Sequence, residues 1–252
     1  MIDNIPNSHG PDSNQPAPSS LFFRRGGIPP QTLRIILITT AVFILQVLTN
    51  FLTGNDLPYY FLGKINEFIL QGQLWRLVTP ILLHGSLLHL LSNMYALFVI
   101  GPSIERAYGS KRYLALYVLS GMFGNVFSFL FTAAPSVGAS TSIFGLVAAE
   151  AVYVYRNRHL FGRTAQPMLF NIALIIFINL AMGMLPGIDY WGHLGGLIGG
   201  LIFAWMAGPI YEMTLTSFGS TLMEKENSHL ERAVLVELIL IFLAALTKFI
   251  HL

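Results

Sequence analysis

The apolar residues of this 252-residue chain gather into seven long runs that are solid rather than alternating. A helix that crosses a bilayer core of about 30 Å needs about 20 predominantly apolar residues, whereas a membrane β-barrel shows alternation. The runs therefore predict seven transmembrane helices, although several are shorter than 20 residues. They are Leu33–Leu52, Leu87–Ile104, Tyr113–Thr132, Ser140–Tyr155, Met168–Leu185, Tyr190–Ala207 and Ala233–Ile250.

Composition supports a membrane protein. The chain is 54% hydrophobic and 10% charged, and its mean hydropathy is +0.63, whereas a soluble globular domain carries about 25% charged residues. These values exclude a soluble protein, and also a disordered one, which needs low hydrophobicity and high charge. A net charge of +2 does not favour nucleic acid as a partner. With no cysteine there is no disulfide, thiol nucleophile or thiolate metal site, and we expect no cofactor or metal.

The basic residues predict the orientation of the seven helices, because cytoplasmic loops are enriched in Lys and Arg. Eleven of the fourteen lie on the side of the N-terminus and three lie opposite. We therefore expect a cell-membrane protein with its N-terminus in the cytoplasm and its C-terminus outside. The eleven are Arg24, Arg25, Arg34, Arg106, Lys111, Arg112, Arg156, Arg158, Arg163, Lys225 and Arg232, and the three are Lys64, Arg76 and Lys248.

Three regions of different character follow from these patterns. Residues 1–32 are rich in Asn, Pro, Ser and Gly and are expected to be a disordered cytoplasmic tail without the features of a signal peptide. Residues 33–208 hold six predicted spans, and residues 209–252 hold a cytoplasmic loop and a seventh span. The external loop Thr53–Thr79 carries so many aromatic and aliphatic residues that we expect it to lie in the membrane interface.

Polar groups at membrane depth are costly, so each is a candidate functional residue. The first cluster is His84, His89 and Asn93. His89 and Asn93 are four residues apart and share a helix face, where two hydrogen-bond donors could stabilise an oxyanion. The alternative is that they bond to another helix and only hold the bundle together.

Ser140 forms the second cluster with Gly138, at the junction of a short external loop and a helix. One interpretation is that Ser140 is a helix N-cap. The other is that it is a nucleophile, since a helix N-terminus favours developing negative charge and Gly138 would let a substrate backbone approach closely.

His193 begins the sixth span and is followed by Gly196 and Gly200 on one stripe. Small residues at this spacing let two helices touch backbone to backbone, and Gly145 and Ala149 offer a similar stripe on the fourth span. Close packing of these spans would bring His193 near Ser140, where it could act as a general base.

Two acidic residues also fall within the predicted spans. Glu150 lies about 15 Å deeper than Ser140 along the helix, too far for its chemistry. We expect a structural carboxyl with Arg156 or Arg158 as partner. Glu237 is expected either to reach the interface or to face the bundle.

The candidate nucleophile, base and oxyanion donors fall at a common depth near the outer ends of their spans, which describes acyl transfer. A transporter would instead place ion-coordinating groups near the bilayer midplane.

Over residues 57–207 the sequence resembles the rhomboid family of intramembrane serine proteases. The matching motifs, in chain order, are Gln73-Leu74-Trp75-Arg76, then His84, His89 and Asn93, the turn Gly101–Gly109, Gly138-Ala139-Ser140, and His193 with Gly196 and Gly200.

The resemblance implies a rhomboid-like six-helix bundle plus one extra C-terminal helix, and an endopeptidase that cleaves transmembrane segments of other proteins. In that scheme Ser140 attacks the peptide carbonyl and His193 is its base, without an aspartate. His89 and Asn93 stabilise the oxyanion, while Trp75 and Arg76 shape the external loop. Two alternatives remain open: a catalytically inactive relative that binds membrane helices, and a transporter or channel.

The chain departs from the family pattern at Thr141, where the family has a second glycine. Threonine fits there if the backbone is helical and does not fit if φ must be positive. The departure also raises Ser142 as a rival nucleophile. We favour Ser140, because side chains two residues apart on a helix point about 200° apart and only one can face His193.

Overall fold

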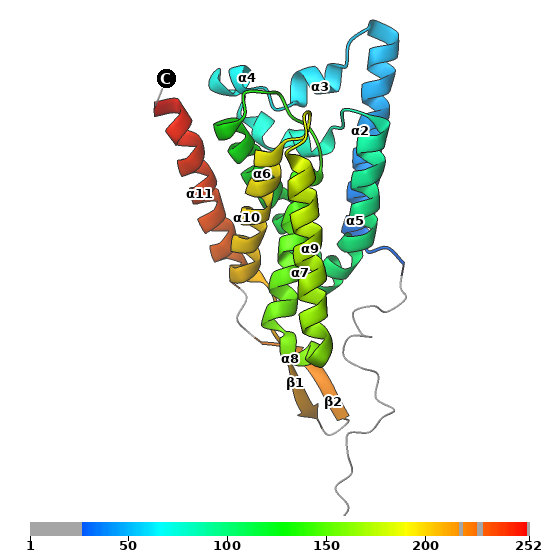
Figure 1. Ribbon diagram of the computed structural model, residues 1–252, viewed down its shortest axis with the longest axis vertical. Coiled ribbons are helices and arrows are strands. Elements are labelled where there is room, and N and C mark those ends of the chain that lie inside the picture. Colours follow the sequence, from blue (N-terminus) through cyan, green and yellow to red (C-terminus); the bar gives the residue numbers. More distant parts are fainter. Residues whose placement is uncertain (1–26, 217–218, 226–228, 251–252) are drawn as a thin grey trace, which may run out of the picture.

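The computed structural model of the protein describes residues 27–216, 219–225 and 229–250. Within them the chain forms seven long helices, with short helices at both ends of the bundle and a β-hairpin at one end (Figure 1). The long helices are α2 (Pro30–Thr53), α5 (Leu87–Tyr108), α6 (Ser110–Phe131), α7 (Ser140–Arg156), α9 (Ala165–Gly183), α10 (Tyr190–Ala207) and α11 (Leu230–Ile250). The short elements are α3 (Leu57–Leu62), α4 (Asn66–Leu70), η1 (Leu74–Leu77), η2 (Thr79–Leu82), α8 (Arg158–Phe161), η3 (Gly162–Thr164), β1 (Tyr211–Thr216) and β2 (Gly219–Glu224).

Each long helix coincides with one apolar run, and the boundaries follow local chemistry. Helix α2 begins at Pro30, because proline suits the first helical position. It ends at Gly54, whose left-handed φ of 72° closes the helix. Residues 30–32 therefore belong to the helix and not to the predicted tail, while residues 1–26 lie outside the described part of the chain.

Five helices of the described residues are long and apolar enough to cross a membrane, which makes the chain a membrane protein. They are α2, α5, α6, α9 with the preceding α8 and η3, and α11. Helices α7 and α10 are not among them, at 17 and 18 residues. The count of seven spans stays a prediction.

The predicted loop between the sixth and seventh apolar runs is in part wrong, because β1 and β2 pair there as an antiparallel hairpin. The register joins Tyr211 to Glu224 at the base of the hairpin. Several bonds hold the base against the bundle: the Tyr211 hydroxyl donates to the carbonyl of Ala107 at 2.9 Å, its backbone N–H donates to the Asn157 side chain at 2.8 Å, and Arg112 pairs with Glu224 at 2.7 Å. The described chain is mostly helical, and this hairpin is the exception to the predicted all-α fold. Hydropathy did not indicate it, because the strands are short and partly polar.

Glu105 joins three helices at the hairpin end of the bundle. Its carboxylate accepts hydrogen bonds from the backbone N–H groups of Gln31 and Thr32 at 3.0 and 2.7 Å, and from the Ser110 hydroxyl at 2.8 Å. A carboxylate satisfies the free N–H groups at a helix N-terminus and complements its dipole. One buried side chain of α5 thus fixes the start of both α2 and α6.

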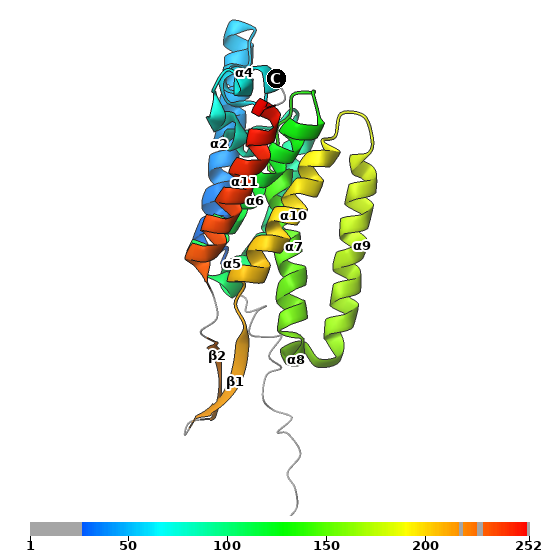
Figure 2. The same cartoon turned by 90° about the vertical axis from the view of Figure 1, so that its left-hand side faces the viewer.

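The centre of the bundle is the packing of α6, α7 and α10, with α2 and α5 on one side and α9 on the periphery (Figure 2). Helix α10 is glycine-rich on two faces. Gly196 and Gly200 lie against backbone atoms of Thr141 and Gly145 on α7, whereas Gly199 lies against Phe123 of α6. Side chains at these glycines would keep the helices apart, so the glycines permit backbone contact.

Enlarging Gly200 should separate α10 from α7. An added Cβ would overlap the backbone of Gly145, so we expect Gly200→Ala to lower the free energy of unfolding by about 1–3 kcal/mol. Thermal unfolding in detergent measures the loss. Gly85→Ala is the matched control, because its added Cβ has only Val137 Cγ2 nearby, at 4.0 Å. Equal losses in the two variants would contradict the packing role of Gly200.

Candidate active site

Ser140 and His193 face each other across the α7–α10 contact. Ser140 is the first residue of α7, and the N-cap position before it is Ala139, which makes no side-chain capping bond. The alternative that Ser140 is an N-cap is therefore wrong. Its Oγ lies instead 2.9 Å from Nε2 of His193, one turn into α10. A hydroxyl within hydrogen-bond distance of an imidazole is the geometry of an activated serine.

The His193 ring is held on one face by an aromatic side chain of α7. It stacks on Phe144, with the ring centroids 4.6 Å apart and the planes at 23°. On its other edge, Nδ1 is buried and has no hydrogen-bond partner among the described residues. If Nδ1 carries the proton, Nε2 is left as the acceptor for the Ser140 hydroxyl. Phe144, four residues after Ser140, was not singled out from the sequence.

Gly138 brings His89 to the same place. Its φ of +140° lies in the range that favours glycine. A Cβ at this position would lie 2.9 Å from His89 Nε2 and 3.4 Å from Ser140 Oγ. The imidazole of His89, the backbone of Gly138 and the hydroxyl of Ser140 therefore meet at one point.

Asn93 lies one turn below His89 on α5 and is buried. Its side-chain amide donates to the carbonyl of His89 at 2.9 Å. This bond stays within one helix, so it is not the bridge to another helix that the structural alternative required. An amide carries two N–H donors, and one of them suffices for this bond.

His84 supports His89 from the preceding loop. The two rings meet edge to face with centroids 4.9 Å apart. Burial lowers the pKa of His84 to about 3, so its imidazole is neutral at ordinary pH. The Gln46 side chain of α2 accepts from the His84 backbone N–H at 3.1 Å and donates to its carbonyl at 3.3 Å.

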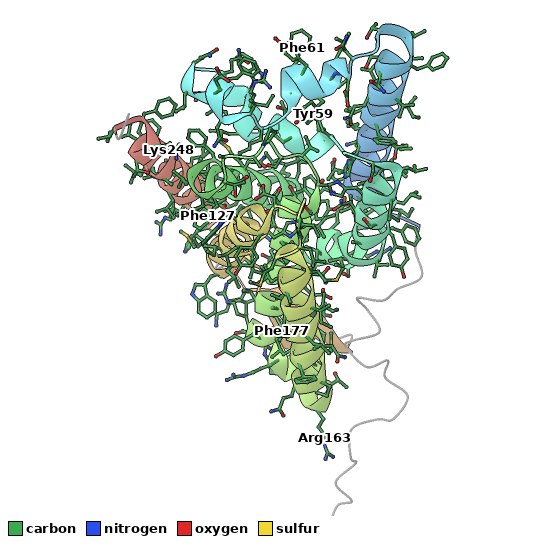
Figure 3. The ribbon with its side chains drawn as sticks, turned by 45° about the horizontal axis from the view of Figure 1, so that its top comes forward. Tyr59, Phe61, Phe127, Arg163, Phe177 and Lys248 are labelled. Carbon is green, nitrogen blue, oxygen red and sulfur yellow. The ribbon has the colours of Figure 1, made fainter. Side chains whose placement is uncertain are left out.

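Arg76 lies within the external loop and joins several of its segments. Its guanidinium is buried and donates to the carbonyls of Gly63 and Tyr60, each at 2.8 Å. It also lies over the ring of Phe68, 4.6 Å from the centroid. Trp75 is half exposed and donates from its indole to the carbonyl of Phe61 at 3.1 Å. Phe61 lies at the α3 end of the molecule (Figure 3).

Lys64 holds the segment that leads into Ser140, a role that the sequence analysis missed. Its buried ammonium donates to the carbonyls of Thr132 and Ala134 at 3.0 and 2.8 Å, where α6 ends. Its backbone forms an antiparallel bridge with Ser136. A cation at a helix C-terminus complements the dipole, so this lysine ties the external loop to the residues before the nucleophile.

Thr141 has helical backbone geometry, since it is the second residue of α7, and no described residue other than glycine has a positive φ. Its side chain fits because Gly124 of α6 and Gly192 of α10 lie next to it. Ser142 is fully buried, and its Oγ lies against Gly121 of α6. It therefore faces α6, whereas Ser140 faces His193 on α10.

The acidic residues take three different positions. Asp189 caps α10, because its carboxylate accepts a hydrogen bond from the N–H of Gly192 at 3.0 Å. An aspartate four residues before His193 is a helix-start signal that the sequence analysis overlooked. The expected partners of Glu150 are not found: within the described ranges the ion pairs are Arg112–Glu224 and Lys225–Glu212. Glu237 is fully buried and faces the bundle.

No group of three potential metal ligands occurs in the described part of the chain.

Comparison with known proteins identifies the family of the chain. A family profile described as "Rhomboid domain" matches residues 71–210. The chain is 40% identical to "Rhomboid protease GluP" of Bacillus subtilis (strain 168) over 181 residues, which is 71% of this chain and 35% of that protein. It is 35% identical to "RHOMBOID-like protein 9, chloroplastic" of Arabidopsis thaliana over 159 residues, covering 63% and 37%. With "RHOMBOID-like protein 5" of the same plant, it shares 33% identity over 190 residues, covering 71% and 61%. The chain thus spans between about a third and three fifths of the length of these relatives.

The buried ammonium of Lys64 should be visible in the pH dependence of stability. Burial lowers its pKa to about 8, with Lys248 adding to the effect and the carboxylate of Asp189 opposing it. Between pH 8 and 10.5 the unfolded chain binds more protons at this lysine than the folded one, so stability rises with pH in that window. We expect the wild type to gain about 3 kcal/mol relative to Lys64→Met across it.

Denaturant titrations of both proteins at pH 8 and 10.5 measure this difference. The same comparison with Lys225→Met is the control, since Lys225 is an exposed lysine of the hairpin. A constant difference between wild type and Lys64→Met over the window would show that Lys64 does not titrate there.

Proposed function

The chain belongs to the rhomboid family, and from that premise we propose that it is an intramembrane serine endopeptidase. Its substrates would be transmembrane segments of other membrane proteins, cleaved by a Ser140–His193 dyad. The observation that carries the proposal is the 2.9 Å contact between Ser140 Oγ and His193 Nε2, with His89 against the adjacent Gly138.

The proposed mechanism has two steps. Ser140 Oγ attacks the peptide carbonyl while His193 Nε2 takes the hydroxyl proton, and His193 then gives that proton to the departing amine. Water hydrolyses the resulting ester, with His193 acting as base for the water and returning the proton to Ser140. The negative charge on the carbonyl oxygen would be stabilised by His89, Asn93 and the N–H of Ser140, which lies at the N-terminus of α7.

The environment of the pair suits this chemistry. Ser140 is partly exposed, so water can reach it. Among the residues that the structure describes, His193 Nδ1 has no hydrogen-bond partner, and Phe144 stacks on the ring. Neutral groups can serve as nucleophile and base at membrane depth, where a permanent charge would be costly.

We also propose that the α3–α4 end of the molecule faces the outside and the hairpin end faces the cytoplasm, in a cell membrane. The support is the asymmetry of basic residues, eleven against three. Arg163 lies at the tip beyond α7, and Lys248 lies near the opposite end, in the upper part of Figure 3. Cleavage would then occur near the external face.

Substitution of the two residues should separate catalysis from folding. In cells that express a single-span reporter, we expect Ser140→Ala to reduce cleavage to background and His193→Ala to reduce it by at least about 10²-fold. Labelling by a fluorophosphonate should disappear with Ser140→Ala as well. Ser142→Ala is the control and should retain both activities, because Ser142 faces α6. Cleavage by the Ser140→Ala protein would refute the assignment of Ser140 as the nucleophile, whereas no labelling of the wild type would favour an inactive relative.

Orientation can be tested with single cysteines, because the chain has none of its own. Asn55→Cys and Arg163→Cys place thiols at exposed positions at opposite ends of the bundle. A membrane-impermeant maleimide added to intact cells should label the first and not the second. Permeabilised cells should show labelling of both, and the reverse pattern in intact cells would overturn the proposed orientation.

A further inference from the structure

An apolar groove lies between α7, α9 and α10, on the half of the bundle away from Ser140. Its volume is about 560 Å³, which is within the usual range of about 300–1,000 Å³ for ligand pockets. Val152 of α7, Leu169 of α9, and Leu201 and Met206 of α10 are among the side chains that line it. The candidate active site does not use this groove, because Val152 lies about 18 Å along α7 from Ser140.

One end of the groove has a cationic rim. The aromatic rings of Tyr155 and Trp205 line the groove, and each has a guanidinium over it. Arg158 lies 5.3 Å from the centroid of Tyr155, and Arg156 lies 5.6 Å from the centroid of Trp205. The groove thus combines an apolar interior with two positive charges at one end.

Neither guanidinium has a carboxylate partner in the ranges that the structure describes. Arg156 donates through Nη1 to the carbonyls of Trp205 and Gly208, at 2.7 and 3.4 Å. Arg158 is exposed. The sequence contains no Asp or Glu from residue 151 to residue 188, and Glu212 of the nearby hairpin is paired with Lys225. The Arg163 side chain extends from the same end of the molecule (Figure 3).

We propose that the groove and the two arginines form a binding site for an anionic glycerophospholipid. An acyl chain would lie in the apolar groove, and the phosphate would lie between Arg156 and Arg158. Guanidinium groups bind phosphate oxygens through two parallel hydrogen bonds. Tyr and Trp rings prefer the level of the headgroups, and basic pockets between helices at the cytoplasmic face suit anionic headgroups.

The site would also give α9 a partner. Only 11% of the apolar segment of this helix is buried within the protein, compared with 61% for α6. Leu169 near its start faces the groove, so a bound acyl chain would fill space between α9 and α10. This proposal concerns lipid binding and does not depend on the proposed peptidase activity.

The test uses the full chain in nanodiscs of phosphatidylcholine with phosphatidylglycerol that carries a diazirine in one acyl chain. Crosslinked peptides are then identified by mass spectrometry. We expect crosslinks in the peptides that contain Leu169 and Leu201. The double variant Arg156→Gln, Arg158→Gln should reduce the yield of these crosslinks about tenfold, because it removes charged hydrogen bonds to the phosphate. A phosphatidylcholine probe should crosslink at the reduced level in both proteins.

Two further variants keep the outcome clear. Arg158→Gln alone changes an exposed side chain and should give part of the loss even if the double variant folds poorly. Arg163→Gln removes a charge at the same end, away from the groove, and should have no effect. Equal crosslinking by the two lipids, or an equal loss with Arg163→Gln, would overturn the proposal. Competition by inorganic phosphate at millimolar concentration would also overturn it, because the site would then bind a free anion and not a lipid.

Discussion

The geometry of this protein depends on the backbone contact between α7 and α10. Gly196 and Gly200 let α10 touch α7 at Thr141 and Gly145. At that separation the first side chain of α7 and the fourth of α10 meet across the contact, and Oγ of Ser140 reaches Nε2 of His193 at 2.9 Å. Dispersion and close packing are the main attractions between helices in a bilayer. The glycines of α10 allow this close packing because they have no side chain, and the close packing brings Ser140 and His193 together.

A second set of contacts fixes the approach to Ser140 from outside the bundle. Two buried cationic side chains of the external loop donate hydrogen bonds to backbone carbonyls. Arg76 bonds within the loop, and Lys64 bonds to the end of α6. The backbone N–H of Gly138 then donates to the carbonyl of Pro80 at 3.0 Å. Each end of the short segment before Ser140 is therefore attached to the loop, which explains how residues with little apolar surface hold one conformation.

Much of this arrangement could be predicted from the sequence. The apolar runs located all seven long helices, because hydropathy reports the length of a buried or lipid-facing helix directly. The spacing of His193, Gly196 and Gly200 indicated which helices would touch. The hairpin β1–β2 could not be predicted from hydropathy, since its two short strands are partly polar. The role of Lys64 could not be predicted either, since it depends on hydrogen bonds to residues about seventy positions away in the chain. The stacking of Phe144 on His193 has the same cause: it exists only once α7 and α10 have packed.

Thr141 has a consequence beyond its own fit. Its side chain occupies space that Gly124 on α6 and Gly192 on α10 leave open, so these three positions share one fixed volume. A Cβ at position 124 would also lie 2.6 Å from the backbone oxygen of Gly192, and one at position 192 would lie 2.8 Å from the Asp189 carboxylate. Both positions therefore require glycine whichever residue stands at position 141. The bulk of the threonine is accommodated by the two helices that face it, and not by a change in the backbone of α7.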